Sequence, residues 1–240
     1  NLVIANAIGR CKRPDPHREA VLGAMAACDA AQVTWAVLPE EDATPETLSR
    51  YSLVLLAGVH HVSPELADGL RAHVHGGGAL LADGACGCLR EDGTPVGDSA
   101  LSDLLGCRLL GVLDTDSSAE WGSYVERVDG PVWRQAPDTF LPTGPRQVEA
   151  EPRGAAVLGW LRPPAVALTD TTWVNWWDPP PAARSSSRPA ILEYTPGKGR
   201  VLYLAYDFFE GSARGLHLNQ ALFNGMLEHL LPDPTLRLLA

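Results

Sequence analysis

The sequence has no cluster of Lys or Arg, although 19 basic residues accompany 29 acidic ones and the formal charge is −10. Nucleic acids and anionic membranes need a cationic face, so we expect neither as a partner. No apolar stretch approaches the roughly 20 residues of a membrane span. Residues 1–8 are apolar but lack the basic start and cleavage pattern of a signal peptide. We therefore expect a cytoplasmic protein.

The chain also lacks an initiator Met, which is typical of a trimmed or excised segment, so an upstream targeting signal is compatible with the sequence. Its five cysteines are an odd number, and 240 residues can build a core without disulfide staples. Cys86 and Cys88 are one residue apart, which is a poor geometry for bridging each other. We expect reduced thiols.

Strand and helix patterns alternate through the first half of the chain. Short apolar runs predict buried strands at 2–7, 32–38, 53–57, 79–82 and 108–113. Helical patterns fall at 16–30, from 44 onward, at 63–75 and at 99–105. Ser63-Pro64-Glu65 supplies a cap and a first-turn proline for the third of these helices, and Gly76-Gly77-Gly78 ends it. Alternation of this kind predicts an α/β fold, a doubly wound and mostly parallel sheet covered on both faces.

The middle of the chain differs, because prolines cluster there and short runs at 155–161 and 165–168 resemble antiparallel strands. Strand patterns return at 190–194 and 200–205, and a helical pattern follows at 216–231. We therefore predict one domain over 1–240, with a core formed by 1–113 and 190–240 and a β-rich insertion at 114–189.

Three segments in order, 48–87, 90–111 and 188–211, resemble one family. They carry the Ser63-Pro64-Glu65 helix start, the glycine turn, an acidic Asp92-Gly93 loop, Leu104-Leu105-Gly106 and a Gly197-Lys198-Gly199-Arg200 hairpin. This order is similar to the β-galactosidase trimerisation domain of bacterial glycoside hydrolases. The resemblance covers nearly the whole chain. It implies the flavodoxin-like fold of class I glutamine amidotransferases and a module that packs beside a (β/α)₈ catalytic barrel and takes part in homo-oligomer contacts. It does not imply that this module does chemistry, and we expect a non-catalytic structural module with no cofactor.

Cys86 stands where amidotransferases place their nucleophile, on a Gly-x-Cys-x-Gly elbow between a strand and a helix. Here Cys88 replaces the second glycine, and an acidic loop follows in place of a helix. A thiol nucleophile also needs a His base oriented by a carboxylate. The matching stretch, 206–210, contains Asp207 but no His. We therefore expect no catalytic residue, with a Cys86-dependent amidase or hydrolase as an alternative.

Two other groups are candidates for ligand or interface contacts. His60 and His61 follow the third strand, but adjacent residues on an extended segment point to opposite faces, so only one readily joins a site and no metal is expected. Trp173, Trp176 and Trp177, with Asn175, form the most unusual local composition. Tryptophan faces stack on sugars, which makes a sugar-binding accessory domain a second alternative, and Trp is also enriched at interfaces.

Parallel α/β sheets bind ligands outside the carboxyl ends of their strands. That rim is expected to bring together 8–10, His60 and His61, 84–86 and Asp207. Docking of another domain at the rim is equally compatible with the pattern.

Overall fold

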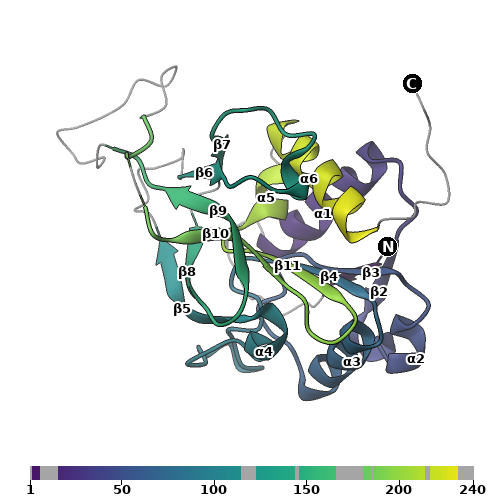
Figure 1. Cartoon of the computed structure of the whole chain (residues 1–240). Coiled ribbons are helices and arrows are strands. Elements are labelled where there is room, and N and C mark those ends of the chain that lie inside the picture. Colours follow the sequence, from purple (N-terminus) through teal and green to yellow (C-terminus); the bar gives the residue numbers. More distant parts are fainter. Residues whose placement is uncertain are drawn as a thin grey trace.

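The computed structural model describes residues 2–5, 16–114, 123–143, 146–165, 181–184, 186–213 and 217–231. They form a mixed α/β fold with a nine-stranded sheet and a separate two-stranded sheet (Figure 1). None of the described helices is long and apolar enough to cross a membrane. The prediction of an α/β chain is confirmed.

One half of the large sheet is parallel. Its strands are β1 (Leu2–Ala5), β2 (Ala36–Pro39), β3 (Leu53–Leu56), β4 (Ala79–Asp83) and β11 (Arg200–Leu204). They pair in the order β2-β1-β3-β4-β11, and all neighbours run parallel. Every residue of β3 and β4 is buried, because strands inside a parallel sheet are covered on both faces.

The other half of the sheet is antiparallel. Its strands, in order beyond β11, are β10 (Pro189–Tyr194), β9 (Ala156–Arg162), β6 (Tyr124–Arg127) and β7 (Leu141–Pro142). A turn with Gly197 at φ +65° joins β10 to β11 and reverses the strand direction. The predicted antiparallel strand at 155–161 is therefore confirmed as β9. The one predicted at 165–168 lies, apart from Ala165, outside the described residues.

Helices cover both faces of the large sheet (Figure 1). On one face lie α1 (Pro16–Ala30), α5 (Phe208–Ala213), α6 (His217–Leu230) and the 3₁₀ turn η2 (Pro131–Trp133). On the other lie α2 (Pro45–Leu48), α3 (Pro64–His75) and α4 (Ser102–Leu105), with the 3₁₀ turn η1 (Glu40–Asp42) before α2. Side chains alternate along each strand, so Leu55 joins the first core and Val54 and Leu56 join the second.

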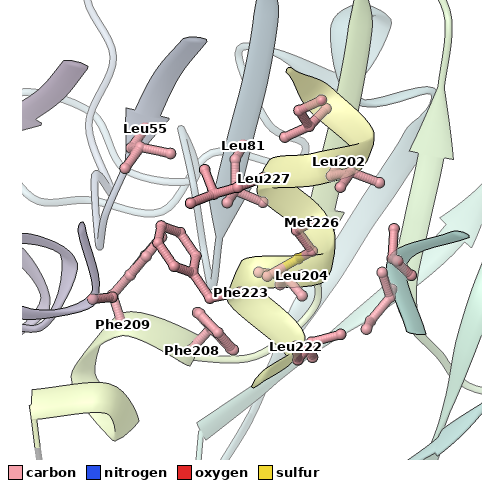
Figure 2. Packing of buried hydrophobic residues seen from close by; sticks show 14 of the residues in the cluster. Leu55, Leu81, Leu202, Leu204, Phe208, Phe209, Leu222, Phe223, Met226 and Leu227 are labelled. Carbon is pink, nitrogen blue, oxygen red and sulfur yellow. The ribbon is translucent and has the colours of Figure 1, made fainter. Parts of the chain in front are cut away.

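Figure 2 shows the first core, where α6 lies across the sheet. Phe223 packs against both Phe208 and Phe209, with ring centroids 6.4 and 5.9 Å away, and the rings of Phe208 and Phe209 lie 5.2 Å apart. Next to them, the buried side chains of Leu222 and Met226 face the strands (Figure 2). Full burial of one such side chain stabilises the fold by about 1.5–3 kcal/mol. This aromatic contact fixes α5 and α6 against the end of β11.

The ends of α3 follow from its sequence. Ser63 Oγ accepts a hydrogen bond from the backbone N–H of Leu66 (3.2 Å), and Pro64 occupies the first turn, where its missing N–H costs nothing. The helix ends at His75, Gly76 is its C-cap residue, and Gly77 follows with φ +114°. This part of the prediction is confirmed. The helix predicted at 99–105 is shorter, because α4 begins only at Ser102.

The strand predicted at 108–113 forms, but it does not join the parallel sheet. It is β5 (Cys107–Asp114), which pairs antiparallel with β8 (Arg146–Pro152) in the two-stranded sheet. The reason is that both edges of β4 are already taken, by β3 and β11. A register shift between Leu109 and Gly111 leaves Leu110 as a bulge in β5.

Strand β8 is attached to the end of β11. The N–H of Val148 donates to the carbonyl of Ala205 (2.8 Å), and Gln147 forms an isolated bridge with Tyr206. The two-stranded sheet therefore stands over the carboxyl end of the parallel strands, beside β10 in Figure 1.

Candidate functional site

A cavity of about 370 Å³ lies between the two-stranded sheet and the chain that follows β3, β4 and β11. This is the edge at which parallel α/β sheets bind their ligands. Its lining combines an aliphatic wall with four polar side chains: His60, Ala85, Cys88, Leu89, Pro95, Val96, Leu109, Leu110, Gly111, Val112, Arg146, Gln147, Val148 and Asp207. The predicted rim residues His60 and Asp207 thus line one cavity, and Ala85 of the 84–86 loop lies with them.

Asp83 holds three strand ends together beneath this cavity. It is the last residue of β4 and only 1% exposed. Its Oδ1 accepts a hydrogen bond from Gly58 N–H (2.8 Å), and its Oδ2 accepts one from Phe209 N–H (2.9 Å). Burial raises the pKa of Asp83 to about 7, with the charge of Asp207 adding to the rise and the backbone hydrogen bonds opposing it. This carboxyl group fixes the loop after β3 and the start of α5 relative to β4.

Asp207 follows β11 and forms an ion pair with Arg146 of β8. Arg146 Nε lies 2.8 Å from Asp207 Oδ2, and Arg146 Nη2 donates to Glu210 Oε2 (3.0 Å). Burial raises the pKa of Asp207 to about 6, while Arg146 lowers it and Glu210 raises it. The Arg146 guanidinium therefore forms ion pairs with both Asp207 and Glu210, and these pairs connect β8 to the start of α5.

Gly84 gives Asp207 its position. It follows β4 with φ +59°, a left-handed conformation that favours glycine. A Cβ atom built on Gly84 would lie 2.3 Å from Asp207 Oδ1. The carboxylate therefore occupies the space that any other side chain would need.

Of the histidine pair, His60 lines the cavity and His61 is not among its lining residues. Burial, and next the charge of Arg146, lower the pKa of His60 to about 4, so its ring is uncharged at neutral pH. His61 forms a backbone bridge with Leu89. Among the described residues, no group of three or more His, Cys, Asp or Glu side chains could hold a metal ion.

The Cys86 thiol does not reach the cavity. Its side chain is 0% exposed, and burial raises its pKa well above the usual range. The backbone N–H after a nucleophile normally stabilises an oxyanion. Here that group, Gly87 N–H, donates to the carbonyl of Val59 (3.0 Å), and Ser99 Oγ donates to the carbonyl of Cys86 (2.7 Å). In this elbow, which we call the closed elbow, the Gly87 N–H already has a hydrogen-bond partner and is not free to stabilise an oxyanion.

The described cysteines, Cys28, Cys86, Cys88 and Cys107, are free thiols. Cys88 lines the cavity and is partly exposed, but burial raises its pKa to about 11. A thiol with that pKa is almost entirely protonated at neutral pH, and the thiolate is the nucleophilic form.

Several predicted candidates lie outside the described residues. These are the cluster Trp173, Asn175, Trp176 and Trp177 and the rim segment 8–10.

No sequence motif indicates two of the cavity residues, Arg146 and Gln147. Arg146 lies in a Pro-rich stretch with no motif around it, and only the attachment of β8 to β11 brings it to Asp207. The aliphatic wall was missed for a similar reason. The apolar run at 108–113 predicts a strand of the parallel sheet, where the β5 residues of this wall would be covered.

Comparison with known proteins shows which solved structures share this fold. The chain matches no protein-family model and no curated protein. Among solved structures it is similar to α-L-fucosidase isoenzyme 2 from Paenibacillus thiaminolyticus (16% identity, TM-score 0.74), covering 97% of this chain and 33% of the fucosidase. It is also similar to the β-galactosidase from Rahnella sp. R3 (16%, TM-score 0.69), covering 95% of this chain and 30% of that enzyme.

A third similar structure is the cytoplasmic protein STM3548 from Salmonella typhimurium (13%, TM-score 0.62), which is matched over 97% of its own length and 95% of this chain. At these identities the likeness shows the fold. The chain spans about 30% of the β-galactosidases that it matches. It therefore has the fold of one segment of β-galactosidases and other glycoside hydrolases, as the predicted resemblance to their trimerisation domain implies.

Proposed function

We propose that this chain is a non-catalytic structural module of a glycoside hydrolase, which packs beside a (β/α)₈ barrel and takes part in oligomer contacts. The observation that carries the proposal is the fold match to about 30% of several glycoside hydrolase chains. A segment that makes up about 30% of a glycoside hydrolase chain is an accessory part of that enzyme. The β-galactosidase activity is a property of the matched enzymes. That this chain belongs to a glycoside hydrolase is itself proposed.

The closed elbow supports the non-catalytic part of the proposal. Thiol catalysis needs an exposed thiolate, a His base and a free oxyanion donor. Cys86 is buried with a raised pKa, and Gly87 N–H is already bonded. His60 lines the cavity that Cys86 does not reach.

The finer fold class belongs to the same proposal. The strand order β2-β1-β3-β4-β11, with helices on both faces, supports a doubly wound, flavodoxin-like sheet of the amidotransferase-like type. Strands β6 to β9 fall between 114 and 189, which supports a β-rich insertion in a core formed by 1–113 and 190–240. A cytoplasmic location is proposed with it.

Native mass spectrometry of the purified chain, alone and mixed with the barrel encoded beside it, tests the structural role. We expect a homo-oligomer or a stable complex with the barrel. A monomer at all concentrations with no affinity for that barrel contradicts the proposal. The neighbouring coding sequence provides an independent check, since a (β/α)₈ barrel is expected there.

A further inference from the structure

The charges in the cavity lining cancel. Arg146 and Asp207 are the two charged side chains among the described lining residues, and they form one ion pair, with Arg146 Nε 2.8 Å from Asp207 Oδ2. Burial lowers the pKa of the His60 ring to about 4 and raises that of the Cys88 thiol to about 11, so both are uncharged at neutral pH. A charged head group would lose its hydration here without meeting an unpaired counter-charge. The lining therefore favours an uncharged ligand.

Gln147 supplies a hydrogen-bond acceptor to this cavity. Its side chain lines the cavity and is only 2% exposed, and its Nε2 donates a long hydrogen bond to Thr143 Oγ1 (3.5 Å). Thr143 Oγ1 gives its own proton to the carbonyl of Ser123 (3.0 Å), so it can only accept from Gln147, which fixes the orientation of the amide. Within the described parts of the chain, no group donates to Gln147 Oε1. This oxygen is left for a donor on a ligand.

The His60 ring is a second polar group without a partner. It is partly buried and lines the cavity, and none of the described residues forms a hydrogen bond with its nitrogens. A neutral imidazole has one N–H donor and one acceptor nitrogen. A hydroxyl group both donates and accepts, so it can donate to Gln147 Oε1 and accept from the His60 N–H. An ether oxygen can only accept.

The remaining wall is aliphatic and partly open. Leu110 and Val112 of β5 are 49% and 52% exposed, and both line the cavity with the buried Leu109 and Val148. An alkyl chain that covers these side chains removes apolar surface from water, which favours binding. The volume of about 370 Å³ falls within the range of small-molecule sites.

We propose that this cavity binds an aliphatic alcohol, with the hydroxyl group at His60 and Gln147 and the alkyl chain along Leu110 and Val112. Nothing in the proposed structural role requires such a ligand, and either proposal can fail without the other.

Titration of the intact chain at neutral pH with n-hexanol, n-hexylamine and hexanoate, followed by NMR chemical shifts, tests the choice of an uncharged ligand. These probes share one alkyl chain and differ in head-group charge. We expect hexanol to bind at least about tenfold more tightly than either ion, because the ions are desolvated without an unpaired counter-charge. Equal or tighter binding of either ion, or no saturable binding of hexanol at millimolar concentration, overturns the proposal.

Methyl pentyl ether, an isomer of hexanol, tests the role of the hydroxyl group. The ether has the same atoms but no O–H donor, so Gln147 Oε1 would stay without a partner. We expect it to bind about fivefold more weakly than hexanol. An ether that binds as tightly as hexanol contradicts a site that selects an alcohol.

Variants separate the two halves of the site. His60→Phe keeps a ring but removes both nitrogens, and should weaken hexanol binding about fivefold. Leu110→Ser should weaken the binding of hexanol and of the ether and, being at an exposed position, should leave the fold intact. The matched control is Leu22→Ser on α1, 41% exposed and not among the cavity residues, which should change no affinity. If either cavity substitution leaves hexanol binding unchanged, the proposal fails.

Discussion

The buried carboxyl group of Asp83 should make the stability of the fold depend on pH, and Asp83→Asn tests this. The pKa of Asp83 rises from 3.8 to about 7 on folding, mainly through burial. A raised pKa means that the folded chain holds the proton more tightly than the unfolded chain. The stabilisation is therefore complete below about pH 3.8 and is lost as pH rises through 7.

The size of the effect follows from this shift. Each pKa unit corresponds to about 1.4 kcal/mol, so Asp83 accounts for a loss of roughly 2 kcal/mol in the free energy of unfolding between pH 5 and 7. Asn at this position does not titrate, so the Asp83→Asn protein should not show this pH-dependent loss in the free energy of unfolding. Asn also offers only one acceptor to the N–H groups of Gly58 and Phe209, which costs about 1–3 kcal/mol at every pH.

Urea unfolding of both proteins across this pH range provides the measurement. The stability advantage of the wild type over Asp83→Asn should shrink by roughly 2 kcal/mol from pH 5 to pH 7. Asp129→Asn is the control, because that carboxylate is fully exposed and its replacement should change stability by the same small amount throughout. An advantage that stays constant or grows with pH would contradict a raised pKa, since Asp83 would then fold as a carboxylate stabilised by its two N–H donors.

Two further substitutions test the packing and the cap. Phe223→Ala removes the ring that packs against Phe208 and Phe209 and should lower the free energy of unfolding by about 3–5 kcal/mol in urea titrations, with a loss below about 1 kcal/mol arguing against this core. Ser63→Ala removes the α3 cap and should cost about 1 kcal/mol, whereas Ser63→Asp should restore most of it; equal stability of all three proteins would show that the cap is unimportant.

The features that could be predicted from the sequence are those with local causes. α3 begins and ends where Ser63, Pro64 and the glycines require, because caps and turns act over a few residues. β3 and β4 were recognisable because strands buried on both faces read as unbroken apolar runs. The position of Cys86 after β4 followed from the same pattern.

The features that were missed depend on partners far away in the chain. An apolar run at 108–113 indicates a strand but not its neighbour, and the choice of β8 arises because β11, nearly 90 residues later, takes the open edge of β4. The same long-range pairing brings Arg146 to Asp207 and creates the cavity wall. The raised pKa of Asp83 is equally non-local, because the groups that act on it, Gly58, Asp207 and Phe209, come from distant parts of the chain.

The claim that this fold serves as a non-catalytic module is tested most directly at Cys86. Iodoacetamide is added to the native chain at neutral pH, and peptide mass analysis then locates the alkylated cysteines, with urea-unfolded chain as the reference. We expect Cys86 to stay unmodified in the native protein and to react once the chain is unfolded, because its thiol is buried and protonated. Rapid, stoichiometric alkylation of native Cys86 would contradict it and would favour a thiol-dependent enzyme.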